Sequence, residues 1–244
     1  FRNLRTKSYR FDSEMNMKNK KGIQKAQYES QIIQVSDGDC RTMEVEMEKA
    51  NGNFYKRKKK YRYYTMKMLD RLFYTHEKFC ESNQNNQKEK SSKMDQYVSE
   101  LKQLIFDPGD KINVPFIGNK TEIFSKKMAP YYDYAITSQQ YVDGRDCYVF
   151  SVRVKPKYQK EKVGKTVIKF LETYFDKKTF QVIARKYQLA YSNLAFSFDV
   201  TMNVQLARLG KKYYPTLVQY DGRWDVPGKK PEIGTFDIKL YDFK

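Results

Sequence analysis

Apolar and polar residues alternate along residues 196–207, and this stretch is the starting point for predicting the fold. The apolar positions are Phe196, Phe198, Val200, Met202, Val204 and Leu206, with polar residues between them. A period of two over this length predicts a strand longer than the usual five or so residues. A strand with one apolar face is typical of an antiparallel sheet whose other face meets water. The rest of the chain must therefore supply a cover for this apolar face.

The same period predicts strands near the start of the chain. One face of the first strand would hold Tyr9, Phe11, Met15 and Met17. Turn signals between the alternating stretches predict a meander of about four strands over residues 4–64. The last strand of this meander would fall in the basic and aromatic residues 54–64.

Alternation returns at residue 131 and continues to residue 243, which predicts a series of long antiparallel strands. Residues 221–231 interrupt this series with a predicted loop that carries the sole tryptophan, Trp224. One interpretation is a long hairpin held by a buried tryptophan. The other is an aromatic side chain on the rim of a ligand site, because binding residues favour loops.

Between the two strand regions, apolar residues recur every three or four positions, which predicts amphipathic helices. The clearest are residues 65–79, with Leu69 and Phe73 on the apolar stripe, and residues 93–106. Residues 119–128 predict a third, short helix that a following proline would end.

Strands, then helices, then strands define the α+β class. We expect a single domain over residues 1–244, with a strand meander at 4–64, a helical cover at 65–128 and long antiparallel strands at 131–243. A sheet of about ten long strands must twist and curl. The expected architecture is therefore a strongly curved antiparallel sheet, an incomplete barrel, with two or three helices covering its concave face.

The chain is strongly basic, with 47 Lys and Arg against 29 Asp and Glu and a net charge of +18. Its densest run of positive charge consists of Lys56, Arg57, Lys58, Lys59 and Lys60. One interpretation is a solvated face, and another is contact with an anionic membrane surface. A third is nucleic-acid binding by residues 54–64, where basic and aromatic residues are interleaved.

Catalytic motifs are weak in this sequence. His76 is the sole histidine and has no accompanying nucleophile motif. Residues 164–166, Gly-Lys-Thr, lack the upstream glycine of a phosphate-binding loop. Glu44, Glu46 and Glu48 would share one strand face and could bind Ca²⁺, but such a row is more often a solvent-exposed face. We therefore expect no enzyme, no cofactor and no metal site.

Cysteine usage leaves the redox state open. Cys40, Cys80 and Cys147 allow one disulfide with one free thiol, or three thiols. No apolar run is long enough for a membrane-spanning helix. The chain starts at Phe1 within an alternating pattern, with no signal peptide, which indicates a mature fragment or a trimmed chain.

Residues 163–170 and 174–185 predict a strand, an Asp-x-x-Thr hairpin at Asp176 and Thr179, and a second strand. With the overall order of strands and helices, this pattern resembles the LolA/LolB/RseB-like superfamily of periplasmic lipoprotein carriers. Residues 218–225, with Tyr-x-Gly-x-Trp-Asp, resemble cell-envelope proteins of Bacteroides-like bacteria. The resemblance implies an incomplete barrel closed by helices, an apolar cavity for acyl chains, no catalysis, and a periplasmic or outer-envelope location.

We therefore expect a non-enzymatic cell-envelope protein that binds an acyl chain, a lipoprotein or an apolar peptide in a cavity between sheet and helices. The expected ligand-binding residues are Phe196, Phe198, Val200, Met202, Val204, Leu206, Leu69, Phe73 and Trp224. The basic run at 56–60 would contact an anionic surface. The alternatives are a nucleic-acid-binding module using residues 54–64, and a structural or interaction domain with a filled core.

Overall fold

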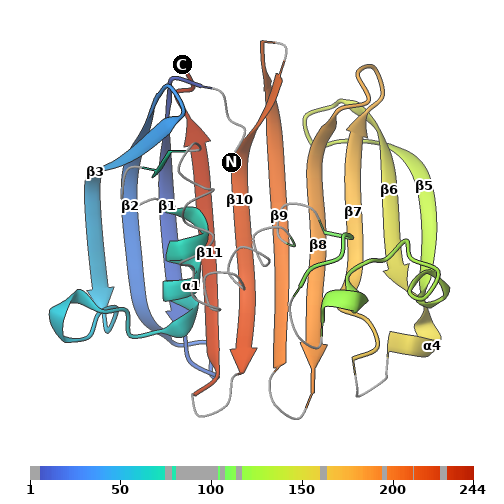
Figure 1. The fold of residues 1–244 in the computed structure, drawn as a ribbon, viewed down its shortest axis with the longest axis horizontal. Helices are drawn as coiled ribbons and strands as arrows, with labels where there is room; N and C mark the ends of the chain where they lie inside the picture. The colour runs from blue at the N-terminus through green and yellow to red at the C-terminus, as the bar shows by residue number, and fades with distance from the viewer. Residues whose placement is uncertain are drawn as a thin grey trace. The chain divides into compact units, whose positions relative to one another are not determined.

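The computed structural model describes residues 6–74, 79–80, 104, 108–113, 117–159, 164–193, 197–210, 212–225 and 230–244. Strands dominate these residues (Figure 1). The chain divides into two units, Phe1–Ser99 with Glu232–Lys244, and Glu100–Pro231. Each unit has its own buried residues.

The first unit consists of strands from both ends of the chain. They are β1 (Ser8–Lys18), β2 (Gln24–Asp37), β3 (Cys40–Gly52), β4 (Phe79–Cys80) and β11 (Glu232–Tyr241). Their order is β4-β3-β2-β1-β11, and all pairs are antiparallel. The predicted apolar face of the first strand is confirmed, because Tyr9, Phe11, Met15 and Met17 are buried.

A polar residue, Ser13, interrupts the buried row of β1 and is stabilised by other hydroxyl groups. Its Oγ lies 2.8 Å from the Oγ of Ser30 on β2, and it also hydrogen-bonds the hydroxyl of Tyr74. Burial raises the pKa of Tyr74 to about 12. The three hydroxyls satisfy one another, so the alternation of β1 continues through a polar position without a buried unpaired group.

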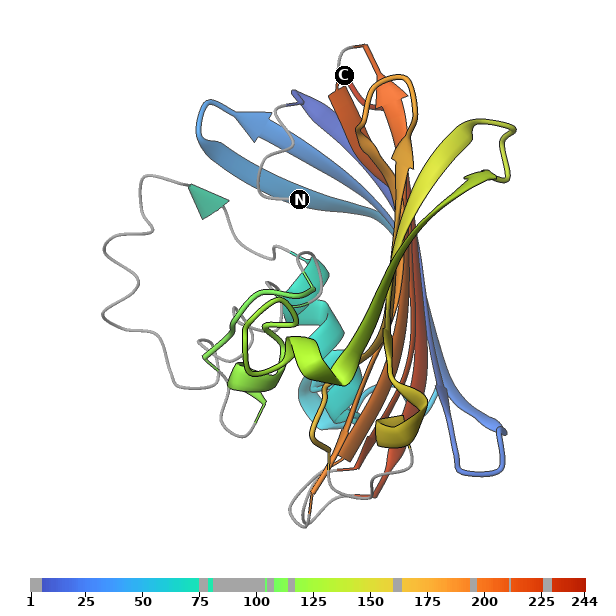
Figure 2. The same ribbon diagram turned by 90° about the vertical axis from the view of Figure 1, so that its right-hand side faces the viewer.

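Helix α1 (Tyr64–Phe73) confirms the first part of the helix predicted at 65–79 and packs on β11 (Figures 1 and 2). The helix ends at Phe73, and Phe79 lies in strand β4, so the predicted end was wrong. No side chain at its N-cap residue caps the helix. Instead the Glu232 carboxylate, from β11, accepts hydrogen bonds from the backbone N–H groups of Tyr64 and Thr65 at 2.9 and 2.8 Å. An acidic group at a helix N-terminus also interacts favourably with the helix dipole. The helix predicted at 93–106 lies outside the described residues except for Leu104, which is buried.

Residues 54–64 do not form the predicted fourth strand of the meander. The chain turns back on itself at the short 3₁₀ turn η1 (Arg57–Lys59), and a single antiparallel bridge joins Tyr55 to Tyr61. Lys58 and Lys59 both have positive φ angles, 59° and 51°, which reverse the chain and end any extended run. The strand prediction was therefore wrong in this segment.

The second unit holds six strands that follow one another in sequence. They are β5 (Tyr132–Gln140), β6 (Asp146–Val154), β7 (Ile168–Asp176), β8 (Val182–Ser192), β9 (Ser197–Leu209) and β10 (Lys212–Asp225), with the short helix α4 (Pro156–Gln159) between β6 and β7. Their order is β10-β9-β8-β7-β6-β5. The long predicted strand is confirmed as β9, in which Phe198, Val200, Met202 and Val204 are buried. Leu206 is half-buried, and Phe196 lies outside the described residues.

Residues 108–113 and 117–131 of the second unit contain turns where a short helix was predicted. The structure forms two 3₁₀ turns, η4 (Gly118–Lys120) and η5 (Ala129–Tyr131), and the prediction of a helix at 119–128 was wrong. The Thr121 hydroxyl lies 2.6 Å from the Asp110 carbonyl oxygen and 2.9 Å from that of Gly118. Such bonds give the backbone an alternative to helical hydrogen bonding. Ile117, Ile123 and Met128 are buried, so the described residues of this segment form an apolar layer. We call it the 108–131 layer.

The predicted fold class, α+β with a curved antiparallel sheet, is confirmed. Figure 2 shows strands of both units bending along their length. Among the described residues, β4 pairs with β3 alone and β5 with β6 alone, so neither unit closes on itself. The prediction of an incomplete barrel is confirmed.

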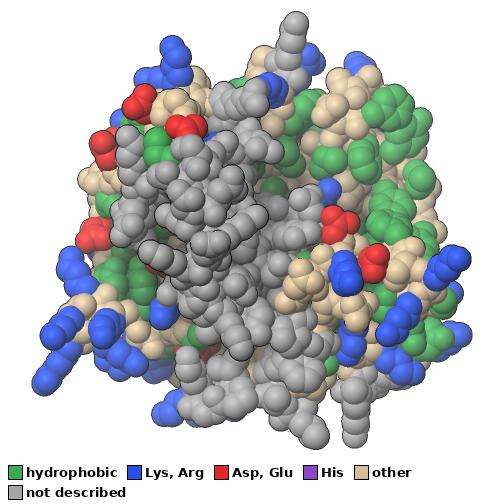
Figure 3. Space-filling model, viewed as in Figure 1, with side chains coloured by type: hydrophobic (Ala, Val, Ile, Leu, Met, Phe, Trp, Pro, Cys, Tyr) green, Lys and Arg blue, Asp and Glu red, His purple; other side chains and the backbone are tan. Residues whose placement is uncertain are grey.

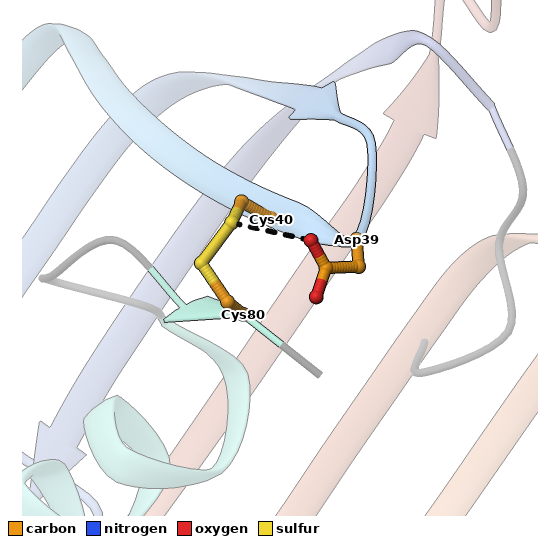
Figure 4. The surroundings of a disulfide bond; sticks show 3 residues. All are labelled: Asp39, Cys40 and Cys80. Carbon is orange, nitrogen blue, oxygen red and sulfur yellow. Dashed lines mark hydrogen bonds between the residues drawn. A yellow bond between two sulfur atoms is a disulfide. The ribbon is translucent and has the colours of Figure 1, made fainter. Parts of the chain in front are cut away.

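A disulfide joins Cys40, at the start of β3, to Cys80 in β4, and Figure 4 shows the pair beside Asp39. The sequence left this pairing open. Cys147 is buried and keeps its thiol, and burial raises the pKa of that thiol. Disulfides persist in oxidising compartments and are rare in the cytosol.

The β7–β8 hairpin depends on one carboxylate. Asp176 accepts hydrogen bonds from the backbone N–H groups of Thr179 and Lys178 at 2.9 and 2.8 Å, and these bonds lower its pKa. A carboxyl whose folded pKa lies below its unfolded value of about 3.9 stabilises the fold above that pH. The stabilisation is lost as the pH falls through the folded pKa.

We expect Asp176→Ala to lower the free energy of unfolding by about 1–3 kcal/mol at neutral pH. The difference from the unsubstituted protein should begin to shrink below about pH 4, and its charge-dependent part should vanish once the pH lies below the folded pKa, where the carboxyl is protonated in both states. Asp176→Asn keeps an acceptor oxygen without a charge and serves as the control, with a smaller loss that does not vary with pH. Denaturant unfolding over a pH series measures all three, and a pH-independent loss for Asp176→Ala would contradict the assignment.

Candidate functional site

One face of the second unit carries two cross-strand rows of mainly apolar side chains. Directly opposite residues in antiparallel strands lie on the same face. From β5 to β10 the first row is Tyr134, Val152, Leu171, Tyr187, Met202 and Tyr220. The second row is Ile136, Phe150, Thr173, Arg185, Val204 and Val218. The predicted ligand-binding residues of β9 therefore share one face with the β5–β6 hairpin.

Trp224 lies within strand β10, and the prediction of a loop at 221–231 was wrong for its first part. The indole is stacked on Phe198 with ring centroids 5.0 Å apart, and its Nε1 donates to the Tyr220 hydroxyl at 2.6 Å. Gly222 stands between Tyr220 and Trp224 on the same face, because a Cβ there would lie 2.1 Å from the Tyr220 hydroxyl. Asp221 and Gly222 therefore form no turn, and Gly222 leaves space for the Tyr220 ring. Trp224 is buried, so it is a packing residue and not an exposed rim.

The same face becomes exposed at β5 and β6. Ile136 is 72% exposed, although its row is buried or half-buried from β6 to β10. We define the β5–β6 patch as the exposed side chains of Phe124, Tyr134, Ile136, Tyr148 and Phe180 together with the half-buried Phe150. Figure 3 shows apolar side chains gathered over these strands. An exposed apolar group of this kind is typical of a binding surface.

The rings of the β5–β6 patch lie against one another. Phe124 is stacked with Tyr134 and with Phe150, with centroid distances of 5.9 and 6.1 Å. Tyr148 is stacked with Phe180 at 6.1 Å. The Nζ of Lys177 lies 5.2 Å from the centroid of the Tyr148 ring, so a cation borders the apolar surface. The arrangement offers apolar contacts with one positive charge at the edge, and it suits an apolar chain with an anionic head group.

The patch is exposed because the 108–131 layer ends at Tyr134. The Tyr134 hydroxyl donates to the Ile123 carbonyl oxygen at 2.6 Å. In the same layer, the Nζ of Lys120 donates to the Gly164 carbonyl oxygen at 2.7 Å and lies 4.4 Å from the centroid of the Tyr191 ring. The sequence showed that Tyr134, Ile136, Tyr148 and Phe150 alternate with other residues. It did not show where the layer that covers this face would end. Their exposure was therefore missed.

The predicted site residues of α1 lie in the core of the first unit. Leu69 is fully buried, and Phe73 packs against Phe236 of β11 with ring centroids 4.9 Å apart. Within that unit they join the helix to the sheet. Their contribution to a ligand cavity stays a prediction.

Residues 56–60 form an exposed tip, which we call the basic tip, at the end of the Tyr55–Tyr61 bridge. Figure 3 shows Lys and Arg side chains gathered over the loop that Figure 1 draws between β3 and α1. At the base of the tip, Phe54 is buried and stacked on Tyr28 at 4.8 Å. The Tyr61 hydroxyl donates to Asp70 of α1 at 2.6 Å, and burial together with this bond raises the pKa of Tyr61. The aromatic residues therefore anchor the loop, and the basic residues project from it.

The three glutamates of β3 are separated by a β-bulge between the pairs Gln31–Met47 and Ile32–Val45. Glu46 forms an ion pair with Arg10 at 2.8 Å. Glu48 lies 3.7 Å from Lys59 and accepts from the Tyr28 hydroxyl. The bulge shifts the alternation by one residue, so the three carboxylates do not converge on one ion.

Among the described residues, the one group with metal-ligand geometry is Asp39, Cys40 and Cys80. Both cysteines are in the disulfide, so neither offers a thiolate to a metal. His76 lies outside the described residues. No helix within the described parts of the chain is long and apolar enough to cross a membrane.

No protein-family model and no curated protein matches this chain. Its structure is similar to that of a putative outer membrane lipoprotein-sorting protein domain from Vibrio parahaemolyticus, with 10% identity, a TM-score of 0.32, and coverage of 97% of this chain and 84% of that one. It is also similar to a LolA superfamily protein from Nitrosomonas europaea, with 8% identity, a TM-score of 0.26, and coverage of 98% and 86%. A DUF1329 family protein from Desulfovibrio piger matches with 12% identity, a TM-score of 0.27, and coverage of 98% and 86%.

The second of these proteins belongs to the superfamily that the sequence resembles. The resemblance of residues 218–225 to envelope proteins of Bacteroides-like bacteria stays a prediction.

Proposed function

We propose that this protein binds a hydrophobic ligand along the β5–β6 patch and catalyses no reaction. The ligand class is an acyl chain, alone or on a lipoprotein, or an apolar peptide. The observation that supports this is the exposed apolar group itself, with Ile136 72% and Phe180 67% exposed. A monomer in water is expected to bury such a group or to use it for binding.

Apolar contacts supply the affinity in this proposal. Burying one exposed aliphatic or aromatic side chain contributes about 1.5–3 kcal/mol, and each buried methylene of a ligand about 0.8 kcal/mol. Several such contacts reach micromolar affinity after the cost of association is subtracted. Lys177 beside Tyr148 favours a ligand with an anionic head group.

The proposed ligand site continues from the patch toward β9. Phe198, Val200, Met202 and Val204 lie on the same face and are buried. A cavity lined by these β9 residues is the finer form of the proposal. The β5–β6 patch would then be the accessible part of one continuous apolar face.

We further propose a location in the periplasm or at the outer envelope. The support within this chain is the Cys40–Cys80 disulfide, because such bonds persist in oxidising compartments. A carrier of hydrophobic ligands in that compartment would move them through water between membranes. No cofactor is needed for such a role.

The proposal predicts that a charge on the patch weakens ligand binding. In Ile136→Asp a carboxylate replaces the most exposed side chain of the second row, and we expect a fluorescent fatty acid to bind about tenfold to a hundredfold more weakly, because the Ile contact is lost and a charge is introduced. Thr137→Asp adds the same charge to the next residue, which is also exposed but lies on the opposite face. This control should bind within about twofold of the unsubstituted protein.

Fluorescence titration measures both variants, and thermal unfolding checks that both fold. Equal weakening in the two variants would show that net charge, and not the patch, governs binding. An unsubstituted protein that takes up no ligand would instead favour a structural or interaction domain with a filled core.

A further inference from the structure

We propose that the basic tip, residues 56–60, is a docking site for an anionic lipid surface. This inference uses the first unit alone and does not rest on the ligand site of the second unit. Three observations support it: the geometry of the turn, the lysines at its positive φ angles, and the aromatic contacts at its base.

The tip is an ordered turn whose cations all point outward. The backbone N–H of Lys56 donates to the Lys60 carbonyl oxygen at 2.7 Å, and that of Arg62 donates to the Phe54 carbonyl oxygen at 3.1 Å. The two bonds and the Tyr55–Tyr61 bridge close a narrow loop. All five basic residues are exposed, and the Lys59 side chain is 85% exposed.

The residues at the turn are not those that backbone stability favours. Lys58 has φ 59° and ψ 37°, and Lys59 follows with φ 51°. Gly and Asn adopt this left-handed region most readily, and a lysine there is strained. Adjacent cations also repel one another. Strained positions of this kind cluster at functional sites, so the two lysines point to a role for their charge.

Glu48 lies beside Lys59 at 3.7 Å, but both side chains are exposed. Water and salt screen such a pair, so it leaves most of the charge of the tip available. Lysine clusters at a negatively charged membrane surface gain about fivefold in affinity for each cation that reaches the head groups. A compact tip with five cations suits a flat array of anionic head groups.

Nucleic acid is the other polyanion that a positively charged tip attracts. The positions of the aromatic residues argue against it. Single-strand binding depends on rings that stack on bases. Here Phe54 is buried against Tyr28, and the Tyr61 hydroxyl is bonded to Asp70. The Cys40–Cys80 disulfide in the same unit also favours an oxidising compartment over the cytosol.

The test uses sedimentation with vesicles of phosphatidylcholine alone and of phosphatidylcholine with phosphatidylglycerol. We expect binding to the anionic vesicles only, and release by salt. In the double variant Lys58→Asn with Lys59→Gly, binding should fall about 25-fold because two cations are lost. Its thermal unfolding temperature should stay equal or rise, since the new residues fit the positive φ angles. A mere folding defect would lower that temperature.

The control is Lys20→Gln with Lys21→Gln, which removes two exposed cations from the turn between β1 and β2. It should bind anionic vesicles within about twofold of the unsubstituted protein. Equal loss in both double variants would overturn the proposal in favour of net charge. Binding to duplex DNA that depends on Lys58 and Lys59, without vesicle binding, would overturn it in favour of nucleic acid. A failure to bind fatty acid would leave this result unchanged.

Discussion

Gly222→Ala is expected to lower the free energy of unfolding by about 2–4 kcal/mol. The new Cβ would lie 2.1 Å from the Tyr220 hydroxyl oxygen and 2.4 Å from the Cζ atom of the same ring. The ring must move, and its hydrogen bond from Trp224 Nε1 at 2.6 Å would be lost. Overpacking and a lost buried hydrogen bond therefore act together.

Two measurements separate these effects. Tyr220→Phe removes the hydroxyl without a clash and should cost about 1 kcal/mol. The sole tryptophan reports on its own environment, so its emission in Gly222→Ala should shift toward that of exposed indole. A loss below about 0.5 kcal/mol in Gly222→Ala would show that the strand relaxes without cost.

Replacing both cysteines of the disulfide, Cys40→Ser with Cys80→Ser, is expected to lower the free energy of unfolding by about 4 kcal/mol. The bond closes a segment with a sequence separation of 40, and its loss restores entropy to the unfolded chain. It also attaches β4, a strand of two residues, to the start of β3. Thermal unfolding with and without reductant measures the effect.

The double cysteine variant is its own control for reduction. Reductant should lower the unfolding temperature of the unsubstituted protein and leave that of the variant unchanged, because the remaining thiol, Cys147, forms no disulfide. A reductant effect of equal size in both proteins would mean that the bond does not stabilise the fold.

The apolar faces of β1 and β9 could be predicted because a period of two marks a half-buried strand directly. Even Ser13, which breaks the pattern of β1, stays on the buried face because Ser30 and Tyr74 hydrogen-bond it. Glu232, which caps α1 from a distant strand, could not be predicted. Its role depends on tertiary contact and leaves no local signal.

Two local sequence patterns led to wrong predictions, a loop at 221–231 and a strand in residues 54–64. Glycine at position 222 reads as a turn, but its function is to leave space for the Tyr220 ring within a strand. Residues 54–64 are rich in strand-forming aromatic residues, but Lys58 and Lys59 take positive φ angles that no pattern of side chains marks. In the first segment the glycine accommodates a ring two residues away, and in the second the chain reverses through the backbone angles of two lysines.

The exposure of Ile136 could not be predicted from alternation alone. Ile136 and Val204 lie in the same cross-strand row on one face, yet Val204 is buried. The difference arises where the 108–131 layer ends, at the bond between Tyr134 and Ile123. How far the layer extends over the sheet depends on tertiary contacts. The pairing of Cys40 with Cys80 among three cysteines depends on them as well.

Titration of the unsubstituted protein with a fluorescent fatty acid tests the central claim most directly, when it is combined with native mass spectrometry after mild purification. We predict saturable binding that an unlabelled fatty acid displaces, and a co-purified apolar species in the mass spectrum. A protein that is free of ligand in the spectrum and takes up no fatty acid would contradict a carrier role for the β5–β6 patch.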